Sequence, residues 1–263
     1  LFAFTLGSTA ELYGCQWITP RADDPNPYLE YLGEMALITA ESSTALIALA
    51  LVGFAVTLYA ADRPDEIVLD LNVGEVPVEI RDNGTETLWM TQQLPEFGET
   101  IAPAAAAAAL GLPVEAIDNW PTQVVSTGLP TIVVPLTNRD ALTAIDVDHA
   151  AYERLTGDRE AKLVHAFCPE PRSEDNDLAV RMFAPFYGVS EDPATGSANG
   201  CLGAYLARHA YFGHGSVDVQ IEQGYEMGRP SLISVQAIDR GTAVDVEVGG
   251  RVVSVARGRL LDD

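Results

Sequence analysis

The chain has 263 residues, 48% hydrophobic and 8% aromatic, a composition that favours a globular fold over a disordered or fibrous chain. Its 38 acidic residues against 15 basic ones give a formal net charge of −23. Because such a surface repels phosphate groups, nucleic acids and anionic membranes are disfavoured as partners. We interpret the acidity as a solvated surface suited to high salt, which predicts a soluble cytoplasmic protein from a halophile.

The cysteines predict neither disulfides nor a metal site. Cys15, Cys168 and Cys201 are odd in number, far apart, and outside any CxxC or Cys/His motif. No signal-peptide pattern begins the chain, but its first residue is Leu, which leaves open whether the native N-terminus is present.

The first long apolar segment is SSTALIALALVGFAVTLYAA, residues 42–61, which carries no charge over a length sufficient for a membrane span. Ser42, Ser43 and Thr44 open it, and no Lys or Arg follows before Arg63. We therefore expect a buried helix running into a strand, and no membrane span.

Three segments of the first half reappear in order in the second half. The first, QWITP (16–20), matches RMFAP (181–185). The apolar helix within 38–51 matches 193–206, and the strand–turn–strand pattern of 69–80 matches 220–235. The repeat predicts an α+β fold of two similar domains, each a mainly antiparallel curled sheet around a central apolar helix.

A boundary between the two domains is expected near residues 111–125. An alanine-rich helix is predicted at 103–110, with its stop at Gly111, and two prolines follow. We therefore expect a first domain over 1–117, short at its N-terminus, and a second over 118–263.

The run EDPATGSANGCLGAYL, preceded by PTQVVSTGLPTIVVPL and followed by QGYEMGRPS, resembles the phenazine-biosynthesis PhzF-like family, relatives of diaminopimelate epimerase. The similarity covers roughly residues 66–263. It implies two domains of epimerase type with the active site in the cleft between them, and usually a homodimer. It also implies isomerisation or epimerisation of a small carboxylated substrate by proton transfer, with no metal or organic cofactor.

The Thr-Gly-Ser turn before the second apolar helix is the predicted anion site. The N–H groups of Gly196, Ser197 and Ala198 open the helix without intrahelical partners, so they suit a substrate carboxylate or a developing enolate. Thr195 belongs to the same turn. Ser197 could donate its hydroxyl to the anion, or serve only as the helix N-cap.

Asp192 is the predicted catalytic or orienting carboxylate, matching the family's aspartate at this position. The alternative is an ordinary Asx-turn aspartate before a proline. In the turn at 226–231, Arg229 could grip a substrate carboxylate or instead pair with a neighbour such as Glu226. His165, His209 and His214 are interpreted as structural.

The first half departs from the family pattern. A Gly-His pair is expected where the repeat places Glu41 and Ser42, and the family's upstream glutamate falls at or before residue 1. Glu41 could substitute as a base if its pKa is raised, or be a solvated glutamate at a helix start. Ser42 would then join the substrate site.

Two functions follow from the sequence. The first is a PhzF-like isomerase or epimerase that uses Asp192, Ser197 and Glu41 on a small carboxylated substrate. The second is a catalytically incomplete relative that only binds a small anion or dimerises. Neither the substrate nor the effect of the missing Gly-His pair follows from the sequence.

Overall fold

The computed structural model describes residues 66–71, 74–82 and 86–251. Contacts divide the chain into two units, Leu1–Thr91 with Gly250–Asp263, and Gln92–Gly249. Glu41, Ser42 and the apolar segment 42–61 lie outside the described residues. No helix of the described part is long and apolar enough to cross a bilayer.

The described part of the first unit is a three-stranded antiparallel meander. Its strands are β1 (Glu66–Leu71), β2 (Gly74–Asp82) and β3 (Glu86–Thr91). Val76 and Val78 alternate with partly exposed neighbours and are buried, the period-2 pattern of a strand with one covered face. The prediction of two strands within 69–80 is confirmed.

The second unit is built on a mixed sheet with the strand order β12-β11-β10-β8-β7-β6-β5-β4, and β9 pairs with β8 outside this path. The pairs β6–β7 and β8–β10 are parallel, whereas β4–β5, β5–β6, β7–β8, β8–β9 and β10–β11 are antiparallel. The strands are β4 (Glu96–Thr100), β5 (Gln123–Ser126), β6 (Thr131–Pro135), β7 (Leu163–Cys168), β8 (Leu178–Ala184), β9 (Val189–Asp192), β10 (Ser216–Gln223), β11 (Ser231–Asp239) and β12 (Val244–Gly250).

The short helices of the second unit begin and end at recognisable signals. Pro103 opens the alanine-rich helix, and Asn138 and Asp148 cap the next two by accepting hydrogen bonds from backbone N–H groups. These helices are α3 (Pro103–Ala109), α4 (Arg139–Thr143) and α5 (His149–Thr156), with 3-10 turns η2 (Val114–Ala116) and η3 (Pro185–Tyr187). The predicted helix at 103–110 and its stop at Gly111, where φ is +67°, are confirmed.

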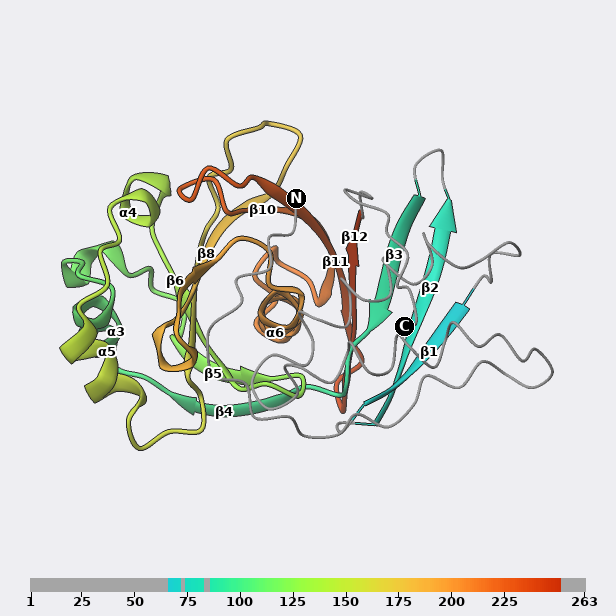
Figure 1. Cartoon of the computed structure of the whole chain (residues 1–263), viewed down its shortest axis with the longest axis horizontal. Coiled ribbons are helices and arrows are strands. Elements are labelled where there is room, and N and C mark those ends of the chain that lie inside the picture. Colours follow the sequence, from blue (N-terminus) through green and yellow to red (C-terminus); the bar gives the residue numbers. More distant parts are fainter. Residues whose placement is uncertain (1–65, 72–73, 83–85, 252–263) are drawn as a thin grey trace, which may run out of the picture. The chain divides into compact units, whose positions relative to one another are not determined.

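The sheet curls around one helix, α6 (Gly196–Arg208), which is seen nearly end-on inside the arc of strands in Figure 1. Every residue of α6 from Gly196 to Ala207 is buried. The helix packs against β5, β6, β7, β10 and β11. A helix with almost no polar face is stable only when it is covered on all sides, as this one is.

Gly203 lets α6 approach the sheet closely. A Cβ at this position would lie 2.4 Å from Cγ1 of Val235 on β11 and 3.6 Å from Cγ1 of Val246 on β12. Since carbon atoms pack at about 3.5–4.0 Å, no larger residue fits without displacing the strand. The close contact between α6 and β11 thus depends on glycine.

The central strands are covered on both faces. On β6, Val133 belongs to the core around α6, whereas Ile132 and Val134 belong to a second core with α3, α4 and α5. On β7, Phe167 faces the α6 core, while Val164 and Ala166 face the second. Strands buried on both sides read as continuous apolar runs, as VVPL and LVHAF do here.

The α+β class is confirmed, and within the second unit so is a mainly antiparallel sheet curled around one apolar helix. The division of contacts after Thr91 does not coincide with the expected boundary at 117/118. Because most of the expected first domain lies outside the described residues, that boundary stays a prediction.

Candidate active site

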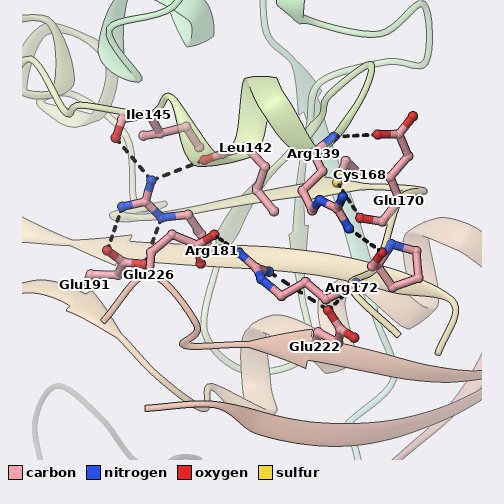
Figure 2. Close-up of polar contacts among 11 residues, drawn as sticks. Arg139, Leu142, Ile145, Cys168, Glu170, Arg172, Arg181, Glu191, Glu222 and Glu226 are labelled. Atoms are coloured by element: carbon pink, nitrogen blue, oxygen red, sulfur yellow. Dashed lines mark hydrogen bonds and ion pairs between the residues drawn. The ribbon is translucent and has the colours of Figure 1, made fainter. Parts of the chain in front are cut away.

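Asp192 is the last residue of β9. The preceding residue, Glu191, forms an ion pair that anchors β9 to β8. Arg181 of β8 binds Glu191 through two hydrogen bonds, Nε to Oε1 at 2.9 Å and Nη2 to Oε2 at 2.8 Å. Its Nη1 donates to the carbonyl oxygens of Leu142 and Ile145, both at 3.1 Å (Figure 2). This bidentate geometry fixes the backbone that carries Asp192.

The Asp192 carboxyl group is half-buried and has a raised pKa. Burial is the largest cause; the Thr195 hydroxyl, the Ala194 backbone and the positive charge of Arg229 act in the opposite direction. Thr195 Oγ1 donates to Asp192 Oδ2 at 2.5 Å. A raised pKa makes the ionised carboxylate a stronger base than that of an ordinary aspartate, which suits a general acid–base catalyst.

The Thr-Gly-Ser turn opens α6, four residues after Asp192. The helix begins at Gly196 with Thr195 as its N-cap residue, so the interpretation of Ser197 as the N-cap is wrong. The reason is local: Thr195 has the extended dihedrals of a cap (φ −102°, ψ 92°), and Ser197 already lies in the first helical turn. The Thr195 hydroxyl does not cap the helix, because it binds Asp192 instead.

The hydrogen-bond donors of the predicted anion site are not used by the helix. The N–H groups of Gly196, Ser197 and Ala198 precede the first intrahelical bond, which Asn199 N–H makes to Thr195 O at 3.1 Å. The Ser197 side chain is buried, and its Oγ has no hydrogen-bond partner within the described part of the chain. A buried unpaired hydroxyl at the positive end of a helix is suited to an anion.

Two buried amides, missed in the sequence, hold this turn in place. Gln223 at the end of β10 bonds the backbone of both Asp192 and Thr195, and Asn199 donates to Gln223 Oε1 at 2.8 Å and to Thr195 O at 2.8 Å. The spacing of Asn199 four residues after Thr195 could have placed it beside the turn. No sequence signal places Gln223 there, because the contact depends on where β10 ends.

The turn after β10 packs against the same loop. Gly224 has φ +78°, and a Cβ there would lie 2.3 Å from Arg229 O and 2.8 Å from Pro193 O. Only glycine fits this conformation and this close approach. The turn therefore brings Arg229 into the electrostatic environment of Asp192.

Glu226 forms an ion pair with Arg172. Arg172 also covers the ring of Tyr225, with its guanidinium carbon 4.5 Å from the ring centroid. Its backbone N–H donates to Glu222 at 2.7 Å (Figure 2). This cluster fixes the turn that carries Arg229.

The three histidines interpreted as structural differ in their burial. His165 lies on β7 and is fully buried, which lowers its pKa to about 4; the Asn199 carboxamide acts in the opposite direction. His209 follows α6, with its ring centroid 4.6 Å from that of Tyr205. His214 is exposed. No group of three or more His, Cys, Asp or Glu in the described ranges could hold a metal ion.

Comparison with known proteins identifies the family of the chain. Residues 42–258 match the family model described as phenazine biosynthesis-like protein, PhzC-PhzF. The chain belongs to the PhzF family.

The chain is 36% identical over 212 residues to trans-2,3-dihydro-3-hydroxyanthranilate isomerase of Pseudomonas aeruginosa, and the match covers 80% of this chain and 72% of that one. A predicted epimerase of the same organism has a solved structure that aligns with a TM-score of 0.66 and 29% identity, covering 82% and 73% of the two chains. A PhzF-family structure from Bacillus anthracis aligns with a TM-score of 0.66 and 24% identity over 79% and 71%, which supports the fold alone.

The structure brings the second-half predictions together and leaves the first-half ones untested. Asp192, Thr195 and the opening of α6 form one connected turn, and Arg229 acts on it electrostatically. Glu41 and Ser42 lie outside the described residues, so their roles stay predictions, as does the cleft between two domains.

Proposed function

We propose that the protein is a PhzF-family isomerase that moves a proton on a small carboxylated substrate by acid–base catalysis, without a metal or organic cofactor. One observation carries the proposal: a carboxyl group of raised pKa, Asp192, lies on the same short turn as the open N-terminus of a buried helix. The two parts have complementary tasks, since one exchanges a proton and the other holds negative charge.

The helix opening would bind the anion. Backbone N–H groups of Gly196, Ser197 and Ala198, with the Ser197 hydroxyl, would stabilise a substrate carboxylate or the enolate-like charge that develops when a C–H proton leaves. Arg229 would add positive charge near the same carboxyl group. Because these dipoles are fixed before the substrate arrives, they need no reorganisation in the transition state.

Asp192 would take and return the proton. In its ionised form it accepts the proton from carbon, and in its protonated form it delivers that proton to another position on the same face of the substrate. Inversion at one carbon would need a second group on the opposite face, for which Glu41 is the proposed candidate. The described turn by itself therefore supports a proton shift better than an epimerisation.

The substrate class follows from the site and from the family. A small acid whose C–H bond is acidified by a neighbouring carbonyl, carboxylate or double bond fits this chemistry. The relative in Pseudomonas aeruginosa is named as an isomerase of trans-2,3-dihydro-3-hydroxyanthranilate, so this compound is the first to test as a substrate. We also propose that the protein forms a homodimer and works in the cytoplasm of a halophilic organism.

Proton exchange at carbon tests the proposal. The full chain is incubated in D₂O at high salt with that compound and a panel of small amino and hydroxy acids, and the loss of C–H signals is followed by NMR. We expect exchange with at least one acid, and its loss in Asp192→Asn. Binding of an acid without exchange would instead favour the alternative of a relative that only binds a small anion.

A further inference from the structure

Gln223 holds the turn of Asp192 through both ends of its carboxamide. Nε2 donates to Asp192 O at 2.7 Å and to Thr195 Oγ1 at 3.1 Å. Oε1 accepts from Thr195 N–H at 3.2 Å and from Asn199 Nδ2 at 2.8 Å. The residue is 1% exposed, and both donor hydrogens and both acceptor lone pairs of its amide have partners.

The backbone fixes the orientation of this amide. A backbone N–H can only donate and a carbonyl can only accept, so the oxygen of Gln223 must face the N–H of Thr195 and its NH₂ must face the carbonyl of Asp192. A flipped amide would place donor against donor and acceptor against acceptor. The NH₂ group is therefore also the donor toward Thr195 Oγ1.

The direction of the next hydrogen bond follows from the first. Thr195 Oγ1 receives a hydrogen from Gln223, so its own hydrogen is directed to Asp192 Oδ2, 2.5 Å away. If Asp192 carried its proton on Oδ2 and donated it to Thr195, the threonine hydrogen would lose this acceptor. The bonds thus form one ordered series, from Gln223 to Thr195 to Asp192.

We propose that Gln223 is a positioning residue for Asp192, which orients the Thr195 hydroxyl so that Oδ2 accepts a permanent hydrogen bond and Oδ1 carries the transferred proton. The inference rests on the proposed function only in taking Asp192 as the acid–base group. The Ala194 backbone also bonds the carboxylate. Each carboxylate oxygen has two lone pairs, so Oδ1 keeps a free position.

The positive charge of Arg229 acts on the Asp192 carboxyl group from the turn after β10, and Arg181 and Glu191 pair with each other across β8 and β9. Thr195→Val leaves these charges and Gln223 in place, so a shift that Gln223 and Thr195 variants share would report the hydrogen-bond series. Since the Thr195 bond favours the ionised carboxylate, its loss should raise the pKa of Asp192.

The experiment follows the Asp192 side-chain carboxyl carbon by ¹³C NMR through a pH titration of the full chain, with Asp192→Asn to assign the signal. Thr195→Val removes the hydroxyl and keeps the shape, whereas Thr195→Ser restores a hydroxyl. Gln223→Met removes the amide. Gln220→Met is the matched control, because Gln220 lies on the same strand and bonds Ser234 Oγ at 3.0 Å, away from the turn.

The expected pattern is specific. The titration midpoint of Asp192 moves upward in Thr195→Val and in Gln223→Met, returns toward the wild-type value in Thr195→Ser, and does not move in Gln220→Met. The double variant of Thr195→Val with Gln223→Met shifts no further than Thr195→Val, because Gln223 acts on the Asp192 side chain through the Thr195 hydroxyl, which is already absent. The pH profile of substrate exchange follows the same order.

An unchanged midpoint in Gln223→Met, or shifts that add in the double variant, would overturn the inference. Gln223→Asn, which shortens the side chain and keeps it polar, replaces Gln223→Met if that variant does not give the dispersed amide spectrum of a folded chain. The titration needs no substrate, so it separates the two proposals. The expected shifts without any carbon exchange would refute the function alone, and exchange without the shifts would refute the role of Gln223 alone.

Discussion

Replacing Arg181 by Met should destabilise the second unit by about 3–5 kcal/mol, the usual cost of breaking a buried ion pair from one side. The side chains of Arg181 and Glu191 are only 10% and 13% exposed. Met leaves the Glu191 carboxylate without its two hydrogen bonds and leaves the carbonyl oxygens of Leu142 and Ile145 without their shared donor. Since Glu191 directly precedes Asp192, β9 should loosen and proton exchange should fall as well.

Arg240→Met provides the matched control. Arg240 binds Asp245 at 2.5 Å, but the two side chains are 61% and 53% exposed. An exposed pair of this kind contributes about 0–1 kcal/mol. The free energy of unfolding of each variant is measured by denaturant titration at high salt. Adding Glu191→Leu to Arg181→Met should recover part of the loss, because the unpaired buried charge is gone.

A loss in Arg181→Met no larger than that in Arg240→Met would refute the reasoning that burial makes the first pair indispensable. A double variant as unstable as Arg181→Met would show that the two carbonyl oxygens, and not the stranded carboxylate, account for the cost.

Three further predictions concern the site, the helix and the surface. Because the pKa of Asp192 is raised in the folded chain, the stability linked to its protonation is present in acid and is lost as the pH rises through that pKa. Asp192→Asn should therefore stabilise the protein by about 0.5–2 kcal/mol at neutral pH and not in acid. The same variant should lower the rate of proton exchange on the substrate by about 10²–10⁴-fold. Equal denaturation midpoints for the wild type and Asp192→Asn at both pH values would contradict the stability prediction. Gly203→Ala should lower stability, since overpacking against Val235 costs about 1–3 kcal/mol and exceeds the gain of about 1 kcal/mol in helix propensity. Gly200→Ala should change stability little, because its new methyl group meets the flexible Gln92 side chain. A melting temperature that is lower for Gly200→Ala than for Gly203→Ala would exclude the steric argument. With a formal charge of −23, the wild-type melting temperature should rise steeply with KCl, and a flat dependence would oppose the high-salt interpretation.

The sequence predicted the features that depend on local pattern. The nearly uncharged run of α6 required a helix covered on all sides, and the structure buries Gly196 to Ala207. The helix stop at Gly111 and the two paired strands at 66–71 and 74–82 also follow from local rules.

Features that depend on tertiary placement could not be predicted. Gln223 lies 28 residues from Thr195 in the chain, and only the pairing of β10 with β8 brings it to the turn. Pairing of Glu226 with Arg172 depends likewise on the loop between β7 and β8. The assignment of the cap to Ser197 failed because side-chain chemistry alone does not show that the Thr195 hydroxyl is occupied by Asp192.

The measurement that tests the central claim most directly is the rate of deuterium uptake from D₂O into a small carboxylated substrate, compared between the wild-type chain, Asp192→Asn and Asp218→Asn. Asp218 is an exposed aspartate on β10 and serves as the control for the loss of one carboxylate. We predict that Asp218→Asn exchanges at the wild-type rate and that Asp192→Asn exchanges about 10²–10⁴-fold more slowly. Equal rates in all three chains would show that Asp192 transfers no proton and would contradict the proposed mechanism.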